Sequence, residues 1–387
     1  MSGARRPIVW FADMPADFHN TEPWRKIAGL RAAGHPVLFV DQLGVANPRP
    51  RNLRKVARLA GRLLRKRAAG AAPDVPQLQL AMLPPRHHRP TNRLNGRLLR
   101  RQILSRTAAL AFDRPILWYR FPTPELVALA DELGAARVVY ECVDRYAAFG
   151  YPRRAAAALA RAEVSLLRRA DLTIVTSEGL RRTVEPQARR VELVRHGSDV
   201  ERFAAPPPAP PDLARLPRPW IGYTGPVDDR LDGSLLAAVA RAHPAGSVVV
   251  IGPVAPSGDG ALLRTVPNVH LLGARPSAAM PAYVGALDVA LLPYRLTPVT
   301  SCIFPVKAVE YLAAGRPCVG TALPEIRLLG DVVEVAEDAA AFVAGVRAAL
   351  AGDGVASPEE RRAVAAEYDW PRRIAVLTAL IDELETR

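Results

Sequence analysis

The sequence predicts an α/β protein made of two doubly wound, parallel-sheet domains. Three observations support this prediction: short apolar runs alternate with amphipathic segments, the pattern occurs twice, and a proline-rich stretch separates the two occurrences. The chain has 387 residues, of which 49% are apolar, so it can bury two sizeable cores. Runs that are apolar on both faces and joined by helices indicate parallel strands that are covered on both sides.

Each half supplies its own predicted strands and helices. In the first half, the patterns predict strands at 7–12, 36–42, 115–120, 136–144, 172–177 and 191–197, with helices at 24–34, 123–134 and 155–170. In the second half, they predict strands at 219–225, 246–253, 269–273, 288–294 and 317–321, with helices at 232–243, 278–287, 304–315 and 338–352. Such sheets define Rossmann-like domains, which bind ligands beyond the carboxyl ends of their strands.

The stretch AAPPPAPPDLARLPRPW marks the predicted domain boundary. Its prolines disfavour a long helix and a central strand, so an extended connector is expected. The predicted organisation is an N-terminal domain at 1–203, a linker at 204–219, a C-terminal domain at 220–368 and a helix at 369–387 that packs back towards the first domain. Most of the positive charge lies in the first of these, which carries 36 basic and 18 acidic residues.

The apolar windows and the cysteine spacing indicate where the protein is located and whether its thiols are free. The apolar run at the start is too short for a secretory signal, and no window is long enough to span a membrane, so a cytoplasmic location is expected. The three cysteines, Cys142, Cys302 and Cys318, are widely spaced and form no metal-binding pattern. Buried free thiols are therefore expected.

A lysine and a glutamate stand three residues apart in SCIFPVKAVEYLAAGRPCVGT. Proline and capping residues place the helix start near 303–306, so Lys307 and Glu310 share one face close to the N-terminus. There, a lysine can neutralise a phosphate and a carboxylate can accept hydrogen bonds from a vicinal diol; a nucleoside diphosphate offers both groups. The alternative is an exposed ion pair worth roughly a few tenths of a kcal/mol.

The residues around this pair resemble a known family. The block DVALLPYRLTPVTSCIFPVKAVEYLAAGRPCVGT is similar to the nucleotide-sugar site of GT-B glycosyltransferases of family 4 (group 1), where a P-x-K-x-x-E-Y-x-A-x-G-x-P-V run is typical. The resemblance extends through YECVDRYAAF, ADLTIVTSEGL and VRHGSDVERF to most of the chain. The segment GYTGPVDDRLDGSLL is like a subgroup that includes the teichuronic acid biosynthesis glycosyltransferase. The resemblance implies a GT-B fold and sugar transfer from a nucleotide-sugar donor.

Carried over by position, the resemblance assigns Glu310 to the ribose hydroxyls and Lys307 to the phosphates of the donor. Arg230, in GPVDDRLDG, is the candidate diphosphate cation, supported by the backbone amide of Gly225. It could instead form a surface ion pair with one of its acidic neighbours, Asp228, Asp229 or Asp232.

Three further residues complete the expected donor-binding set. Arg275 lies in the segment 273–277, which resembles the loop whose backbone contacts the base. Tyr294 and Pro305 lie in the segment that leads into the helix of Lys307.

The first domain is expected to bind the acceptor. Asp13 and His19 lie in its opening loop, where the family's paired glycines are missing, and either could act as a general base or orient the acceptor hydroxyl. Asp13 could equally shape the turn before a capped helix. Asp144, in YECVDRY, matches a position that often faces the cleft in relatives. It completes the catalytic candidates.

No metal is expected, because the GT-B resemblance implies that cations and a helix N-terminus neutralise the departing diphosphate. The acidic segment VDDRLD is interpreted as structural. The resemblance to family 4 also implies transfer with retention of configuration at the anomeric carbon. The transferred group is expected to be a hexosyl or related sugar.

Two arginine-rich segments, 51–67 and 86–106, form the last notable feature. The first has eight basic residues, no acidic residue and leucines at helical spacing. An anionic membrane surface is the partner that this pattern favours, with a solvated helix as the alternative. Nucleic acid is not expected, because no recognition motif accompanies the charge.

The function expected from these observations is transfer of a sugar to a hydroxyl of a glycan, lipid-linked or small-molecule acceptor, in cell-envelope or polysaccharide biosynthesis. An epimerase-like GT-B sugar-nucleotide enzyme, a degenerate transferase that binds without transferring, and a non-catalytic basic protein that binds nucleic acid or membranes are the alternatives.

Overall fold

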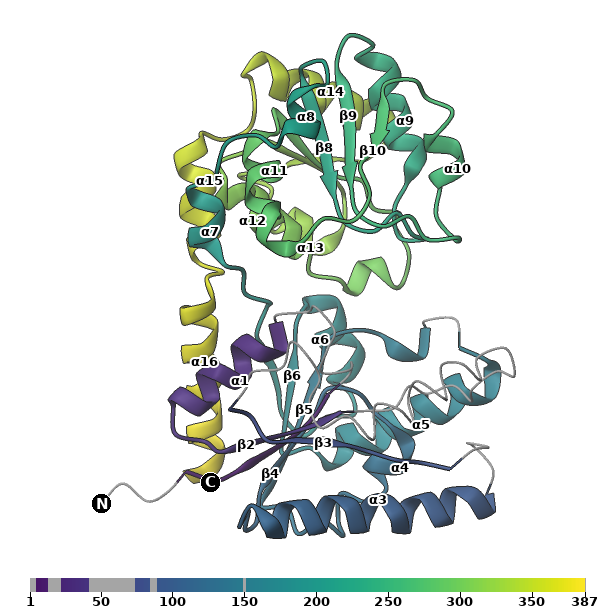
Figure 1. Ribbon diagram of the computed structural model, residues 1–387, viewed down its shortest axis with the longest axis vertical. Helices are drawn as coiled ribbons and strands as arrows, with labels where there is room; N and C mark the ends of the chain where they lie inside the picture. Colours follow the sequence, from purple (N-terminus) through teal and green to yellow (C-terminus); the bar gives the residue numbers. More distant parts are fainter. Residues whose placement is uncertain (1–4, 13–21, 42–73, 84–88, 149–150, 387) are drawn as a thin grey trace. The chain divides into compact units, whose positions relative to one another are not determined.

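The computed structural model describes residues 5–12, 22–41, 74–83, 89–148 and 151–386 (Figure 1). The chain forms two compact units. Unit 1 comprises residues 1–176, 180–194 and 374–387, and unit 2 comprises 177–179 and 195–373. The candidate catalytic residues Asp13 and His19 and the basic segment 51–67 lie outside the described residues.

Unit 1 contains one parallel sheet whose strand order, β3-β2-β1-β4-β5-β6-β7, is that of a doubly wound fold. The order reverses between β1 and β4, so the topological switch point lies there. The strands are β1 (Ile8–Phe11), β2 (Val37–Asp41), β3 (Gln77–Gln79), β4 (Ile116–Tyr119), β5 (Arg137–Cys142), β6 (Leu172–Val175) and β7 (Val191–Leu193).

Helices contribute the rest of the core of unit 1. On one side, Ile27 and Leu30 pack with the strands, and so do Leu377, Ile381 and Leu384 of the last helix. The stacked rings of Trp10 and Trp118 lie in the same cluster. The helices are α1 (Glu22–Ala32), α3 (Arg89–Ala109), α4 (Pro124–Val127), α5 (Arg153–Arg169) and most of α6 (Glu178–Val184) and of α16 (Trp370–Thr386).

Unit 2 repeats the same topology. Its parallel sheet has the order β10-β9-β8-β11-β12-β13, with the switch point between β8 and β11. The strands are β8 (Trp220–Thr224), β9 (Ser247–Ile251), β10 (Val269–Leu271), β11 (Val289–Leu292), β12 (Cys318–Thr321) and β13 (Glu334–Ala336). The predicted α/β class with two Rossmann-like sheets is confirmed.

Two apolar clusters form the core of unit 2. One includes Leu236, Val239 and Phe342 from α9 and α14, and the other includes Val309 and Leu312 from α12. The helices of this unit are α7 (Val200–Ala204), α8 (Pro211–Ala214), α9 (Gly233–Ala242), α10 (Gly260–Leu263), α11 (Met280–Ala286), α12 (Val306–Ala313), α13 (Pro324–Arg327), α14 (Ala339–Ala351) and α15 (Pro358–Ala366).

The proline-rich segment differs from the predicted extended linker. Residues 204–219 belong to unit 2, and Pro211 begins the short helix α8. Leu213 of that helix is fully buried in the core of the unit. Proline is tolerated at the first helical position because its missing N–H has no helical partner there, and burial of Leu213 helps to hold the segment against the unit. The boundary therefore falls near 195 rather than 203.

The predicted buried free thiols agree with the structure. Cys142, Cys302 and Cys318 are buried and free. Among the described helices, none is long and apolar enough to cross a membrane.

Candidate functional site

The helix α12 begins where the sequence predicted. Pro305 occupies the N-cap position and Val306 starts the helix, which leads away from the end of β11 at the switch point of unit 2. The loop before it is held by Thr300, whose side chain accepts a hydrogen bond from the backbone N–H of Thr297 at 2.9 Å. Lys307 therefore lies in the first turn, beyond the carboxyl ends of the strands.

Lys307 reaches across to the loop after β8. Its ammonium lies 5.9 Å from the ring centroid of Tyr223. Gly225 has φ +139°, and a Cβ there would lie 2.3 Å from the Cε of Lys307 and 2.9 Å from its Nζ. Glycine is thus required both by the backbone conformation and by the close approach of the lysine.

The predicted role of the Gly225 amide is not what the structure shows. Its N–H donates to the carbonyl of Ile251 at 2.8 Å, so the amide is already used in holding two neighbouring loops together. The contribution of Gly225 to the site is therefore the space in which Lys307 lies.

Glu310 lies one turn further along α12 and is half-buried. Desolvation raises the pKa of its carboxyl to about 7, although the positive charges of Lys307 and Arg202 lower it and Asp199 raises it. Among the described residues, no hydrogen bond or ion pair satisfies either the Glu310 carboxylate or the Lys307 ammonium. An unsatisfied carboxylate and ammonium near a strand end are suited to a ligand that carries both hydroxyls and negative charge.

Arg230 forms an ion pair with a neighbouring aspartate, which was the alternative to a role as a free diphosphate-binding cation. Its guanidinium binds the carboxylate of Asp228, with Nε at 3.1 Å from both oxygens and an Nη at 2.6 Å. Burial opposes ionisation of Asp228, but the hydrogen bonds and charge of Arg230 outweigh it, so the pKa of Asp228 is lowered. The pKa of Arg230 is raised, chiefly by the hydrogen bond with Asp228. The charge of Lys307 also lowers the pKa of Asp228, but Asp228 is hydrogen-bonded to Arg230 and already compensates the charge of that guanidinium.

Tyr294 and Tyr311 hold together the backbone segments that carry these charged groups. Tyr294 is buried and its backbone pairs with Leu231, so the segment after β11 lies beside the loop of Arg230. The hydroxyl of Tyr311 accepts a hydrogen bond from the backbone N–H of Thr224 at 2.9 Å, which ties α12 to the end of β8. These contacts place the predicted residue Tyr294 beside the site.

The side chain of Arg275 is held within unit 2, and its part in donor binding stays a prediction. Its guanidinium binds Asp212 at 2.7 Å and the hydroxyl of Tyr283 at 2.9 Å. The hydroxyl of Tyr283 in turn donates to Asp212 at 2.8 Å. Because its donors are used in this way, Arg275 fastens the proline-rich segment to unit 2.

Sequence reasoning missed Arg202 and Asp199 as neighbours of Glu310. They belong to the segment 195–203, which was assigned to the first domain, yet α7 packs against α12 in unit 2. Arg202 donates to the carbonyl of Ser277 at 3.0 Å and to Asp199 at 3.2 Å. Nothing in the local sequence around Arg202 indicates that α7 packs against α12.

In unit 1, the candidate Asp144 follows the end of β5 and is half-buried. Its backbone carbonyl accepts hydrogen bonds from the N–H of Tyr146 at 3.0 Å and from the thiol of Cys142 at 3.7 Å. The predicted position at a carboxyl-end loop is therefore confirmed, while its catalytic role stays a prediction.

A buried charge network lies in the same unit and was not foreseen. Lys26 of α1 contacts Glu22 and Glu141, and Arg120, directly after β4, contacts Glu22. The indole N–H of Trp118 donates to Glu141 at 2.9 Å. The charges compensate one another, which a buried group requires, and they fix the start of α1 at the carboxyl ends of β4 and β5. A glutamate inside the apolar run VVYEC was the available signal.

Comparison with solved structures defines the class. The chain is similar to sucrose-phosphate synthase from Thermosynechococcus elongatus, with a TM-score of 0.73, 17% identity and coverage of 99% of this chain and 100% of that one. It is also similar to HepE from Anabaena in complex with UDP-glucose, with a TM-score of 0.68, 14% identity and coverage of 97% and 99%. Two Rossmann-like units with this topology and these neighbours define a GT-B fold.

The sequence comparisons give the family. Residues 218–352 match the family model described as glycosyl transferases group 1. The chain is 30% identical over 279 residues to a Bacillus subtilis (strain 168) protein provisionally named as the teichuronic acid biosynthesis glycosyltransferase TuaH, covering 67% of this chain and 69% of that protein. The chain belongs to the group 1 glycosyltransferases, as its sequence motifs predicted.

Proposed function

We propose that this glycosyltransferase uses a nucleoside diphosphate sugar bound by unit 2 and transfers the sugar to a hydroxyl of a cell-envelope glycan or lipid-linked glycan. The observation that carries the proposal is the pair of unsatisfied side chains, Lys307 and Glu310, on one helix at the switch point of the sheet. One binds anions and the other accepts hydrogen bonds, so together they match a diphosphate and a ribose.

In this proposal, Glu310 accepts hydrogen bonds from the two ribose hydroxyls and Lys307 lies against the diphosphate. As the bond between the sugar and the diphosphate breaks, negative charge grows on the phosphate oxygens, and Lys307 stabilises it. Arg230 adds a second cation when a phosphate competes with Asp228 for its guanidinium. Pro305 and Tyr294 shape the surface from which these groups project. No metal is part of the proposed mechanism, because these cations supply the charge.

The proposed donor is a UDP-hexose. Structural relatives with the same fold include HepE in complex with UDP-glucose and an E. coli trehalose-6-phosphate protein bound with UDP-2-fluoro glucose. The name of the Bacillus subtilis relative refers to teichuronic acid biosynthesis, which supports a cell-envelope acceptor. Retention at the anomeric carbon follows from the family resemblance, and the acceptor hydroxyl is assigned to unit 1, near Asp144, with Asp13 and His19 as further candidates.

Calorimetric titration of the chain with UDP, GDP, ADP, CMP and dTDP at fixed salt tests the donor site. We expect UDP to bind most tightly and Glu310→Ala to weaken that binding at least about tenfold, the effect of losing hydrogen bonds to a charged group. Glu359→Ala is the matched control, because Glu359 is an exposed carboxylate on α15. If UDP binds equally well to Glu310→Ala, the assignment of the ribose is wrong; if another nucleotide is preferred, the proposed base is wrong.

We also propose that unit 1 contacts an anionic membrane surface through α3. This helix carries six arginines and no acidic residue, and Arg93, Arg97 and Arg101 are exposed on it together with Leu94. Each basic side chain near an anionic surface contributes about 1 kcal/mol of attraction.

Flotation with vesicles of phosphatidylcholine alone, or with added phosphatidylglycerol, tests the membrane proposal. We expect the chain to float only with the anionic vesicles, and the triple change to glutamine at Arg93, Arg97 and Arg101 to reduce the bound fraction. The control makes the same change in charge at three exposed arginines of α5, Arg153, Arg154 and Arg161. Equal loss in both variants would mean that only net charge matters, and the role of α3 would be wrong.

A further inference from the structure

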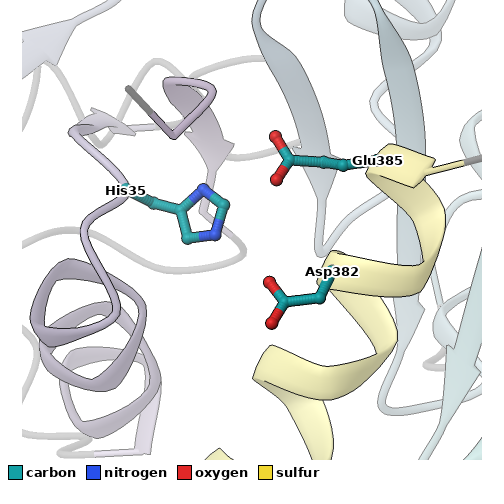
Figure 2. Close-up of side chains that lie close together, drawn as sticks. All are labelled: His35, Asp382 and Glu385. Carbon is teal, nitrogen blue, oxygen red and sulfur yellow. The ribbon is translucent and has the colours of Figure 1, made fainter. Parts of the chain in front are cut away.

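A histidine and two carboxylates converge in unit 1, at a place that the transfer reaction does not use. His35 lies in the turn between α1 and β2, and Asp382 and Glu385 lie one turn apart on α16. Figure 2 shows the three side chains pointing toward one another. One ligand atom from each lies within 4.8 Å of the others.

The histidine has one nitrogen available. His35 is 1% exposed, and its Nδ1 lies 2.9 Å from the backbone carbonyl of Arg6. Because a carbonyl only accepts, Nδ1 must carry the hydrogen, which leaves the lone pair on Nε2. Nε2 is buried and has no hydrogen-bond partner. Leaving a buried acceptor unsatisfied is unfavourable, and an imidazole oriented by a backbone carbonyl through its other nitrogen is the usual arrangement of a metal ligand.

Arginines compensate the two carboxylates at present. The guanidinium of Arg5 contacts both oxygens of Asp382, one of them at 3.2 Å, and lies 3.6 Å from Glu385. The backbone N–H of Arg6 donates to Glu385 at 3.2 Å. The side chain of Arg5 is 37% exposed, so it can turn into solvent when another cation takes its place.

We propose that His35, Asp382 and Glu385 bind a divalent transition-metal ion of the Zn²⁺ type. The ligands are Nε2 of His35 and one oxygen from each carboxylate, with water in the remaining position, a donor set that suits zinc. Bonds of about 2.0–2.2 Å need ligand atoms closer together than 4.8 Å, so the three side chains move slightly inward as the metal displaces Arg5.

The role of this metal is structural. His35 precedes β2, and Arg5 and Arg6 precede β1, so the site lies at the amino ends of the strands. Doubly wound sheets bind their substrates at the opposite, carboxyl ends. The metal joins the segment before β1, the turn before β2 and the last helix of the chain, and it makes no contribution to the proposed donor chemistry.

Zinc titration of the full chain, without an affinity tag and after treatment with EDTA, tests the site. We expect uptake of one equivalent of Zn²⁺ by calorimetry and a rise in melting temperature that saturates at the same ratio. Asp382→Asn and His35→Gln should each weaken binding at least about tenfold, whereas Glu383→Gln, on the same helix but outside the cluster, should bind as the wild type does. Asp382 is partly exposed, so Asp382→Asn keeps the test informative if His35→Gln fails to fold.

Arg5→Gln separates the proposal from a purely structural ion pair. If a metal and Arg5 compete for the carboxylates, removing the guanidinium should tighten zinc binding by about tenfold or more, the effect of about 1.4 kcal/mol of lost competition. If the carboxylates serve only in their contacts with Arg5 and Arg6, the variant melts at a lower temperature and zinc does not restore it. Absence of one-equivalent uptake in both the wild type and Arg5→Gln, or uptake that Asp382→Asn leaves unchanged, overturns the proposal.

Discussion

Replacing Glu310 with glutamine should stabilise the fold while it removes donor binding. Burial raises the pKa of the Glu310 carboxyl from 4.5 to about 7, so above pH 7 the folded chain carries a charge that the unfolded chain accommodates more easily. Each pKa unit corresponds to about 1.4 kcal/mol, so the shift has an upper limit of about 3.4 kcal/mol. Because Glu310 is only half-buried, screening by solvent reduces the expected gain to about 1–2 kcal/mol.

The pH dependence identifies the origin of the gain. Below pH 4.5 the carboxyl is protonated in both the folded and the unfolded state, so the penalty is absent. The penalty grows as the pH rises from 4.5 to about 7 and is constant above that. We expect the melting temperatures of Glu310→Gln and the wild type to agree near pH 4.5 and to differ by about 3–6 °C at pH 8, by differential scanning fluorimetry. Glu359→Gln should show no such trend. A difference between Glu310→Gln and wild type that does not change with pH, or a lower melting temperature at pH 8, would refute the reasoning.

Three further changes test the packing around the sites. Gly225→Ala should lower stability by about 1–3 kcal/mol and displace Lys307, which calorimetry would detect as weaker UDP binding; unchanged affinity would show that the position of Lys307 is unimportant. Arg275→Ala should lower the melting temperature through loss of its charged hydrogen bonds but leave UDP affinity within about twofold; a loss of affinity would place the guanidinium on the nucleotide. Glu141→Ala should cost about 3–5 kcal/mol in urea unfolding, because it leaves Lys26 buried beside one fewer carboxylate; unchanged stability would contradict a compensating network.

Among the described strands, the sequence predicted all but one edge strand in each sheet. Runs such as IVWF and SVVVI are buried along their whole length, and burial on both faces leaves a continuous apolar pattern. The missed strands, Gln77–Gln79 and Glu334–Ala336, have three residues each and lie at the edges of their sheets. Three partly buried residues give little periodicity to recognise, although the equally short edge strands β7 and β10 were predicted.

The helix predicted at 123–134 shows a second limit of predicting secondary structure from apolar spacing. Only Pro124–Val127 is helical, and the following residues form turns. The apolar spacing is satisfied because Leu126, Leu129 and Leu133 are all buried. Periodicity therefore identified which residues face the core without identifying their hydrogen bonding.

For the candidate site, features that depend on local spacing could be predicted from the sequence, whereas contacts between residues far apart in the chain could not. Three residues of separation on a helix place Lys307 and Glu310 on one face, and the structure has them in that helix. The partner of Arg230 is two residues away and could be named among alternatives. Arg275 and Asp212, however, are 63 residues apart, and their contact depends on how a proline-rich segment folds onto unit 2, which no local pattern encodes.

The core of unit 1 needs both ends of the chain, with consequences for synthesis. Ile8 and Trp10 pack in the same cluster as Leu377, Ile381 and Leu384, whereas all of unit 2 lies between them in the sequence. The whole of unit 2 is therefore synthesised before the residues of the last helix that complete the core of unit 1. Until then, the nascent first unit exposes the apolar face that this helix covers. A chain that ends between residues 374 and 376 would contain all of unit 2 but lack Leu377, Ile381 and Leu384 of the unit 1 core.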